Sequence, residues 1–138
     1  MKIFLDTNIF LDLLLKREKY ENAVTILNSV KLGYMEAYIL DITVVNMHYI
    51  AKKQAKNIID FLNRINQVCI IKGADNKIVE KALKIANIDF EDNLQYILAK
   101  EFRCKTIVTN DKNFYKKDIE VLNSTEFIDK YLKEKNGF

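Results

Sequence analysis

Short apolar runs alternate along this chain with longer stretches in which apolar residues recur every three or four positions. The runs have the length of buried strands, and the stretches have the spacing of amphipathic helices. Strands are predicted at residues 3–5, 35–40, 68–71 and 106–109, with a possible short fifth at 119–122. Helices are predicted at residues 7–14, 20–30, 42–50, 55–66, 78–86, 91–102 and 124–132, the last of them capped by Ser124.

The order of these elements predicts the fold class. Strands that are separated by helices pair in parallel through right-handed crossovers. The first and fourth strands are apolar throughout, as central strands are when helices cover both faces of a sheet. We therefore expect an α/β fold, a three-layer α/β/α sandwich around a central, mainly parallel sheet, with residues 1–138 forming a single domain.

Composition narrows the class of protein without deciding its function. Apolar residues make up 49% of the chain, which excludes a disordered protein, and the net charge of +3 permits nucleic-acid binding without arguing for it. Cys69 and Cys104 fall in apolar runs without metal-ligand spacing, so we expect reduced core thiols of a cytoplasmic protein. Asp6 interrupts the first apolar run too early for a signal peptide, and no segment is apolar for long enough to cross a membrane.

Acidic residues stand at three places where an element begins or ends. Asp6 follows the first strand, Asp89 and Asp92 lie where a helix begins, and Asp111 follows the fourth strand. Each place has an ordinary explanation: a helix cap for Asp6, acids that favour a helix dipole for the pair, and a turn for Asp111. The carboxyl ends of parallel strands are, however, where open α/β folds place their sites.

Together the three places predict a metal site. If the first and fourth strands are neighbours, Asp6 and Asp111 converge, and a helix that begins near Asp92 brings a third carboxylate to the same edge. Three carboxylates in one crevice repel each other unless a cation joins them. Oxygen ligands suit Mg²⁺ or Mn²⁺, and the single histidine, His48, cannot supply a histidine cluster for zinc.

Two segments of the chain, FLDTNIFLDLL and FEDNLQYILAKEFRCKTIVTNDKNF, resemble the PIN domain, in particular the VapC-like toxins of bacterial toxin–antitoxin pairs. The resemblance covers nearly the whole chain and implies a metal-dependent ribonuclease. It assigns the first, third and fourth acids of the family to Asp6, Asp92 and Asp111, and the polar partner of the first acid to Asn8. It also implies a homodimer and a cognate antitoxin protein as a partner.

The chain departs from the family pattern at Asn46, where a glutamate is usual. An asparagine can ligate a metal through its carbonyl oxygen or hold a metal-bound water, but it carries no charge and cannot act as a base. Alternatively, Asn46 is only a polar residue on a helix face near the crevice. Either metal affinity is weaker here, or a nearby acid such as Asp41 or Asp89 compensates for the missing charge.

The preferred interpretation is a Mg²⁺- or Mn²⁺-dependent endoribonuclease that cleaves RNA phosphodiester bonds. Asp6, Asp92 and Asp111 would be the catalytic metal ligands. The supporting residues would be Asn8, Asn46 and Asp89, and the candidates for contacts with RNA phosphates are Lys112, Lys116 and Lys117. The alternative is a PIN-like nucleic-acid-binding or interaction module that has lost strong catalysis, with Asn46 as the mark of that loss.

Overall fold

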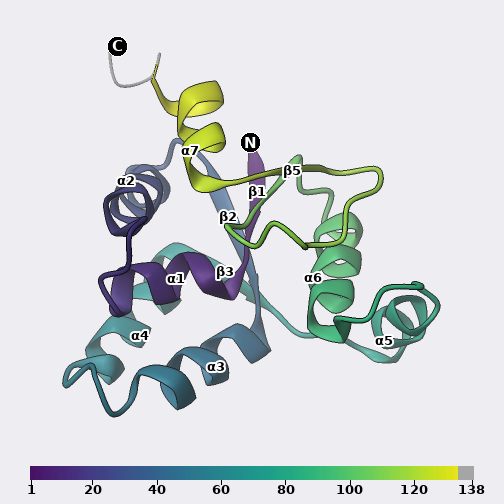
Figure 1. The fold of residues 1–138 in the computed structure, drawn as a ribbon, viewed down its shortest axis with the longest axis horizontal. Coiled ribbons are helices and arrows are strands. Elements are labelled where there is room, and N and C mark those ends of the chain that lie inside the picture. Colours follow the sequence, from purple (N-terminus) through teal and green to yellow (C-terminus); the bar gives the residue numbers. More distant parts are fainter. Residues whose placement is uncertain (134–138) are drawn as a thin grey trace.

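A parallel five-stranded sheet forms the centre of the computed structural model, which describes residues 1–133 (Figure 1). The strand order is β3-β2-β1-β4-β5, and every neighbouring pair is parallel. The strands are β1 (Lys2–Leu5), β2 (Glu36–Leu40), β3 (Cys69–Lys72), β4 (Thr106–Val108) and β5 (Glu120–Leu122). Residues 134–138, the end of the predicted domain, lie outside the described residues.

Helices cover both faces of this sheet, which confirms the predicted three layers (Figure 1). One face packs against α1 (Thr7–Leu14), α2 (Tyr20–Lys31), α3 (Asp41–Ala51), α4 (Ile58–Val68) and α7 (Ser124–Phe127), which continues as the π-helical turn η1 (Ile128–Leu132). The other face packs against α5 (Asn76–Leu83) and α6 (Phe90–Glu101).

The side chains of β1 show how the two apolar layers are divided. Ile3 and Leu5 belong to the layer under α1 and α2, whereas Phe4 belongs to the layer under α6. Successive side chains of a strand point to opposite faces, so a strand between two helical layers must be apolar at every position. All three side chains are fully buried, and each contributes about 1.5–3 kcal/mol to folding relative to an exposed position.

Two predicted helix starts are wrong by a few residues, each for a local reason. The helix predicted to begin at residue 55 begins at Ile58, since residues 52–57 form turns. The last helix is capped by Asn123 and not by Ser124: the side chain of Asn123 accepts a hydrogen bond from the Glu126 amide, and the Glu126 carboxylate accepts one from the Asn123 amide. Such reciprocal bonds satisfy two free helix-end donors at once.

The two cysteines lie where the sequence predicts, in the core and unpaired. Burial raises the pKa of the Cys69 thiol to about 12, and burial likewise raises that of Cys104 to about 12. Both thiols are therefore protonated and unreactive at neutral pH. None of the helices that residues 1–133 form has both the length and the apolar character needed to cross a membrane.

Candidate functional site

Asp6 and the loop that carries Asp111 lie side by side at the carboxyl edge of the sheet. β1 and β4 are neighbours, with Leu5 opposite Val108, so the residues that follow the two strands meet. The backbone amide of Asp6 extends this pairing by donating to the carbonyl of Val108 at 3.1 Å. The expected adjacency of the two strands is thus present.

Asp6 occupies the N-cap position of α1, but its carboxylate makes no side-chain capping hydrogen bond to that helix and instead bonds to residues of α6 and of the loop after β4. Its Oδ1 accepts a hydrogen bond from Gln95 Nε2 at 2.9 Å, and its Oδ2 accepts one from Thr109 Oγ1 at 2.7 Å. The residue is 5% exposed. Burial raises the pKa of Asp6 despite these two hydrogen bonds, and the charge of Asp111 raises it further.

Asp92 enters the site from the first turn of α6. Asp89 caps this helix, since its Oδ1 accepts a hydrogen bond from the Asp92 amide at 3.0 Å. The Asp92 side chain is 5% exposed, and no donor within residues 1–133 bonds to its Oδ2. Burial raises the pKa of Asp92 to about 7, with further contributions from the charges of Asp6, Asp89, Asp111 and Glu91. The three predicted carboxylates are therefore close enough for their charges to interact.

Asn46 also reaches this site, but it does so through an acid that the sequence analysis overlooked. Its Nδ2 donates to Glu91 Oε1 at 2.7 Å. Of the two acids suggested as compensation for Asn46, Asp89 caps α6 and its charge also acts on Glu91 and Asp92. The Asp41 carboxylate lies against Gly73, where an added Cβ would come within 2.9 Å of its Oδ2. Burial raises the pKa of Glu91, while the bond from Asn46 lowers it and the charges of Asp6 and Asp89 raise it.

Thr109 joins the two strand ends through one hydroxyl group. Its Oγ1 donates to Asp6, accepts from Asn8 Nδ2 at 3.2 Å and accepts from the Asp111 amide at 3.1 Å. Asn8 also accepts from the Asn110 amide at 3.2 Å, so it supports the loop that carries Asp111. Asp111 Oδ1 accepts from the Asn113 amide at 2.9 Å, which is the bond of an Asx turn.

Asn110 anchors this loop on its other side. Its Nδ2 donates to Asp12 Oδ2 at 2.7 Å, and its Oδ1 accepts from the amide and the hydroxyl of Ser124 at 2.9 and 3.0 Å. Asp12 is 7% exposed, and Ser124 is fully buried. Because buried hydrogen bonds from α1 and α7 meet on one side chain, the position of Asp111 is determined by several elements at once.

The chemistry of these side chains fits a hard divalent cation. The donors are carboxylate and amide oxygens, and Asp92 Oδ2 is a buried acceptor without a protein donor, as a ligand atom would be. Within residues 1–133, however, no three acidic, histidine or cysteine side chains are already arranged around one point as metal ligands. The hydrogen bonds explain this: Asp6 is held by Gln95 and Thr109, and Asp111 by Asn113, so a cation would share or take over these oxygens.

Three site residues escape the sequence analysis: Glu91, Gln95 and Thr109. Gln95 carries a signal, because it lies three positions after Asp92 and thus on the same face of a helix. Glu91 belongs to the acidic segment around Asp92, but the direction of its side chain depends on how α6 packs near α3, which the sequence does not show. Thr109 ends an apolar strand and looks like part of it.

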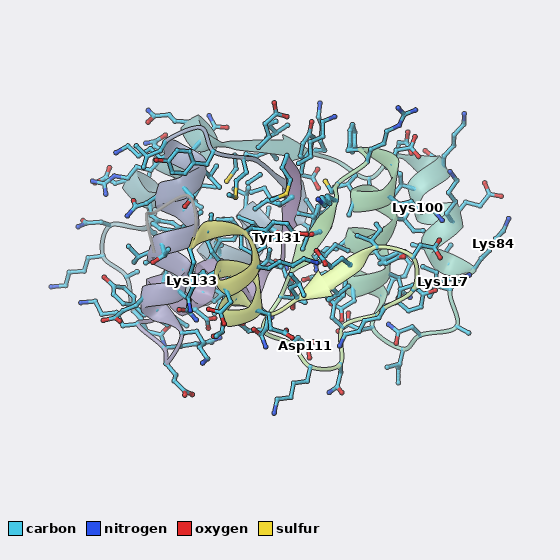
Figure 2. All side chains as sticks on the ribbon, turned by 90° about the horizontal axis from the view of Figure 1, so that it is seen from above. Lys84, Lys100, Asp111, Lys117, Tyr131 and Lys133 are labelled. Carbon is cyan, nitrogen blue, oxygen red and sulfur yellow. The ribbon has the colours of Figure 1, made fainter. Side chains whose placement is uncertain are left out.

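The predicted lysines divide into two groups. A cavity of about 380 Å³ opens beside Asp111, and its lining includes Lys112 and Lys116. Lys117 lies farther along the loop on the α6 side, away from Asp111 (Figure 2). Asp118, the neighbour of Lys117, forms an ion pair with Lys100 at 2.9 Å in the last turn of α6. The proposed ligand Asp92 lies in the first turn, at the other end of this helix.

Sequence comparisons identify relatives of the chain. A profile of the PIN domain family matches residues 2–113. The chain is also 36% identical over 141 residues to "Ribonuclease VapC1" of Aquifex aeolicus (strain VF5), and the alignment covers 94% of this chain and 95% of that protein. The family match includes the strand ends and the start of α6 at which the carboxylates lie.

Solved structures share the fold. VapBC2 from Rickettsia felis, bound to a DNA fragment from its promoter, matches with a TM-score of 0.68 and 18% identity over 89% of this chain and 98% of that one. Mycobacterium tuberculosis VapC20, a sarcin-ricin loop cleaving toxin, matches with a TM-score of 0.64 and 11% identity over 81% and 92%. These structures establish the likeness of fold, and the sequence matches establish the family: the chain belongs to the PIN domain family and is VapC-like.

Proposed function

We propose that this chain is a metal-dependent endoribonuclease of the VapC type that cleaves phosphodiester bonds in RNA. The observation that carries the proposal is the buried acidic site at the carboxyl edge of the sheet, in a chain 36% identical to a protein named ribonuclease VapC1. The proposed ligands of Mg²⁺ or Mn²⁺ are Asp6, Asp92 and Asp111. When bound, such a cation activates a water molecule for in-line attack and stabilises charge on the scissile phosphate.

The remaining side chains of the site orient these ligands. Thr109 and Gln95 hold the two oxygens of Asp6, so the plane of this carboxylate is defined before a cation arrives. Asn46 cannot act as a base and instead holds Glu91 beside Asp92. In this proposal Glu91 supplies the negative charge that the family usually carries at the position of Asn46, while Asn8 and Asp89 support the loop and the helix end.

The RNA would approach past Asp111 along the cavity lined by Lys112 and Lys116. Both lysines line the same cavity as Asp111, and their ammonium groups would bind phosphates near the cleaved bond. Contacts of this kind position the substrate without reading its sequence. Lys117 stays a predicted contact; it lies on the α6 side of the loop, so it would meet the RNA farther from Asp111 (Figure 2).

We also propose a cytoplasmic location, where RNA is available, and two protein partners. The structural relative from Rickettsia felis is a VapBC2 assembly, which supports a cognate antitoxin as one of them. A second copy of the chain is the other, as the exposed apolar side chains of α3 suggest: Ile42, Val45 and Tyr49 are 40, 60 and 71% exposed and lie on one helical stripe. Sedimentation that gave a monomer at high micromolar concentration would contradict the homodimer.

Cleavage of single-stranded RNA by the purified protein tests the activity. We expect cleavage with Mn²⁺ or Mg²⁺ and none with EDTA. Asp92→Asn should lower the rate by about 100-fold or more, since it removes a charged ligand, whereas the matched control Asp118→Asn changes an exposed acid that is paired with Lys100. Equal loss in both variants, or no cleavage by the wild type with either cation, would contradict the proposal.

The second candidate is a PIN-like module that binds nucleic acid or a protein with weak or lost catalysis. The observation in its favour is Asn46 itself, together with carboxylates that are hydrogen-bonded within the protein. The same experiment separates the two candidates. Retention of RNA on a filter without any cleavage, in the presence of Mn²⁺, is the result expected for the binding module.

A further inference from the structure

Gln95 lies at the centre of the acidic site and is fully buried. It is three residues after Asp92, so the two side chains extend from the same face of α6. Its Nε2 donates to Asp6 Oδ1 at 2.9 Å. The amide nitrogen can only donate and the amide oxygen can only accept, so Oε1 needs a donor or a cation as its partner.

Two buried oxygens in this site receive no hydrogen bond from any donor within residues 1–133: Asp92 Oδ2 and Gln95 Oε1. Both are acceptors, and both belong to the face of α6 that is turned toward Asp6. Buried acceptors are rarely left without a partner, and a pair of them beside a carboxylate is the environment that a cation or its water molecules would satisfy.

We propose that Gln95 is a polar member of the cation site, with its Nε2 fixing Asp6 and its Oε1 facing the hydrated cation. The inference rests on the proposed metal dependence and extends it to a residue that is uncharged. The two ends of the side chain have separate tasks, which makes them separable by substitution. A residue that served only to fill space or to hold Asp6 would not require an oxygen atom at the place of Oε1.

Two substitutions of Gln95 distinguish these tasks. Gln95→Met keeps the length and the helix propensity of the side chain but removes both polar atoms. Gln95→Glu keeps an oxygen that can face the cation while it removes the donor to Asp6. The matched control is Asn93→Leu on the same helix, because Asn93 is buried and, within residues 1–133, its side chain exchanges hydrogen bonds only with Asn87, in the loop before α6.

Mn²⁺ affinity by calorimetry is the measurement. We expect Gln95→Met to weaken binding by about 10- to 100-fold, the range for residues that orient metal ligands, while Gln95→Glu binds at least as tightly as the wild type. Asn93→Leu should stay within about twofold. Equal loss of affinity in the Met and Glu variants would mean that Gln95 only holds Asp6. Unchanged binding by Gln95→Met would exclude Gln95 from the site. Either result overturns the inference, and so does an equal loss of affinity in Asn93→Leu.

A measurement on the wild type covers the case in which a variant does not fold. In a ¹⁵N-labelled sample, the side-chain amide signal of Gln95 should shift on titration with Mg²⁺, whereas that of Asn93 should not. A Gln95 signal that stays unchanged while the protein binds Mg²⁺ overturns the inference. Failure of the wild type to bind either cation would instead contradict the proposed metal dependence itself, so the two failures are distinguishable.

Discussion

Asn46 on α3 donates a hydrogen bond to Glu91 on α6 at 2.7 Å, so an uncharged residue and an acid share one edge of the site. A glutamate at position 46 would place a second carboxylate against Glu91. In the proposed function Glu91 supplies the acid at this edge in place of the glutamate that the family pattern usually carries at position 46, and this contact makes the effect of a glutamate at that position predictable.

Asn46→Glu should destabilise the metal-free protein. The variant loses the donor to Glu91 and adds a like charge beside it, which we expect to lower the free energy of unfolding by about 1–3 kcal/mol at neutral pH. Because Mn²⁺ gains from each anionic oxygen, the rise in melting temperature on adding Mn²⁺ should exceed that of the wild type. Thermal unfolding with EDTA and with Mn²⁺ measures both effects, and an unchanged melting temperature in EDTA would mean that residue 46 does not face Glu91 in solution.

The sequence predicts which strand ends carry the site better than it predicts which side chains of α6 point into the site. Asp6 and Asp111 follow apolar strands, and parallel strands end at one edge, so the two residues meet if β1 and β4 are neighbours, an order that the sequence leaves open and the structure supplies. The directions of Glu91 and Gln95 depend on how α6 is rotated against the sheet, and a helix with buried residues on most of its faces does not reveal that rotation. Ser124 was mistaken for a cap because Asn123 and Ser124 are both good capping residues, and only the bond to Glu126 decides between them.

The metal-free protein should lose stability as the pH rises from about 4 to about 7. The pKa of Asp92 is about 7 in the folded protein against an ordinary 3.8, so the folded protein binds this proton more tightly than the unfolded chain does. The stabilisation is complete below pH 3.8 and is lost as the pH rises through 7. Asp6 and Glu91, whose pKa values are also raised, act in the same direction. The decline has an upper limit of about 1.4 kcal/mol per pH unit for one group.

Urea denaturation in EDTA between pH 4 and pH 8 measures this decline. The variant Asp92→Asn should flatten the curve, since it removes the titrating group while keeping a polar side chain of similar size. Saturating Mn²⁺ at pH 7 should restore the lost stability, because a bound cation favours the charged carboxylates. A wild-type protein whose stability rises across this range would contradict the buried position of Asp92.

Glu120 should stabilise the opposite edge of the sheet with the reverse dependence on pH. Burial raises the pKa of Glu120, but hydrogen bonds from Lys130, Thr106 and Tyr131 outweigh that effect and bring the pKa to about 2. Tyr131 is labelled in Figure 2. The contribution of Glu120 is present above the unfolded pKa of 4.5 and is lost as the pH falls through 2. Glu120→Gln should therefore cost about 1 kcal/mol at pH 7 and progressively less toward pH 2, as chemical denaturation at several pH values can measure.

The control for this experiment is Asp118→Asn. Asp118 pairs with Lys100, but both side chains are more than half exposed, and exposed ion pairs contribute little to stability. Similar losses in the two variants would mean that charge alone matters at this edge. A loss confined to Glu120→Gln would assign the effect to the partly buried hydrogen bonds with Thr106 and Tyr131.

Thr109 provides the sharpest test of how the site is held together. Its hydroxyl donates to Asp6 and accepts from Asn8 and from the Asp111 amide, so one oxygen connects three parts of the site. Thr109→Val preserves the shape of the side chain and removes all three bonds. Asp6 Oδ2 then lacks its donor while Gln95 still donates to Oδ1, and we expect a loss of about 2–4 kcal/mol in the free energy of unfolding.

The partner variant Thr109→Ser keeps the hydroxyl and removes only a methyl group, which should cost about 1 kcal/mol. Mn²⁺ affinity separates the site from the fold: it should fall by about 10-fold or more in Thr109→Val, because Asp6 is no longer oriented, and stay near the wild-type value in Thr109→Ser. Equal Mn²⁺ affinities in the two variants would show that the hydroxyl stabilises the sheet edge without orienting Asp6. The bond between Thr109 and Asp6 would then be a feature of the fold, and Gln95 would remain as the residue that orients Asp6.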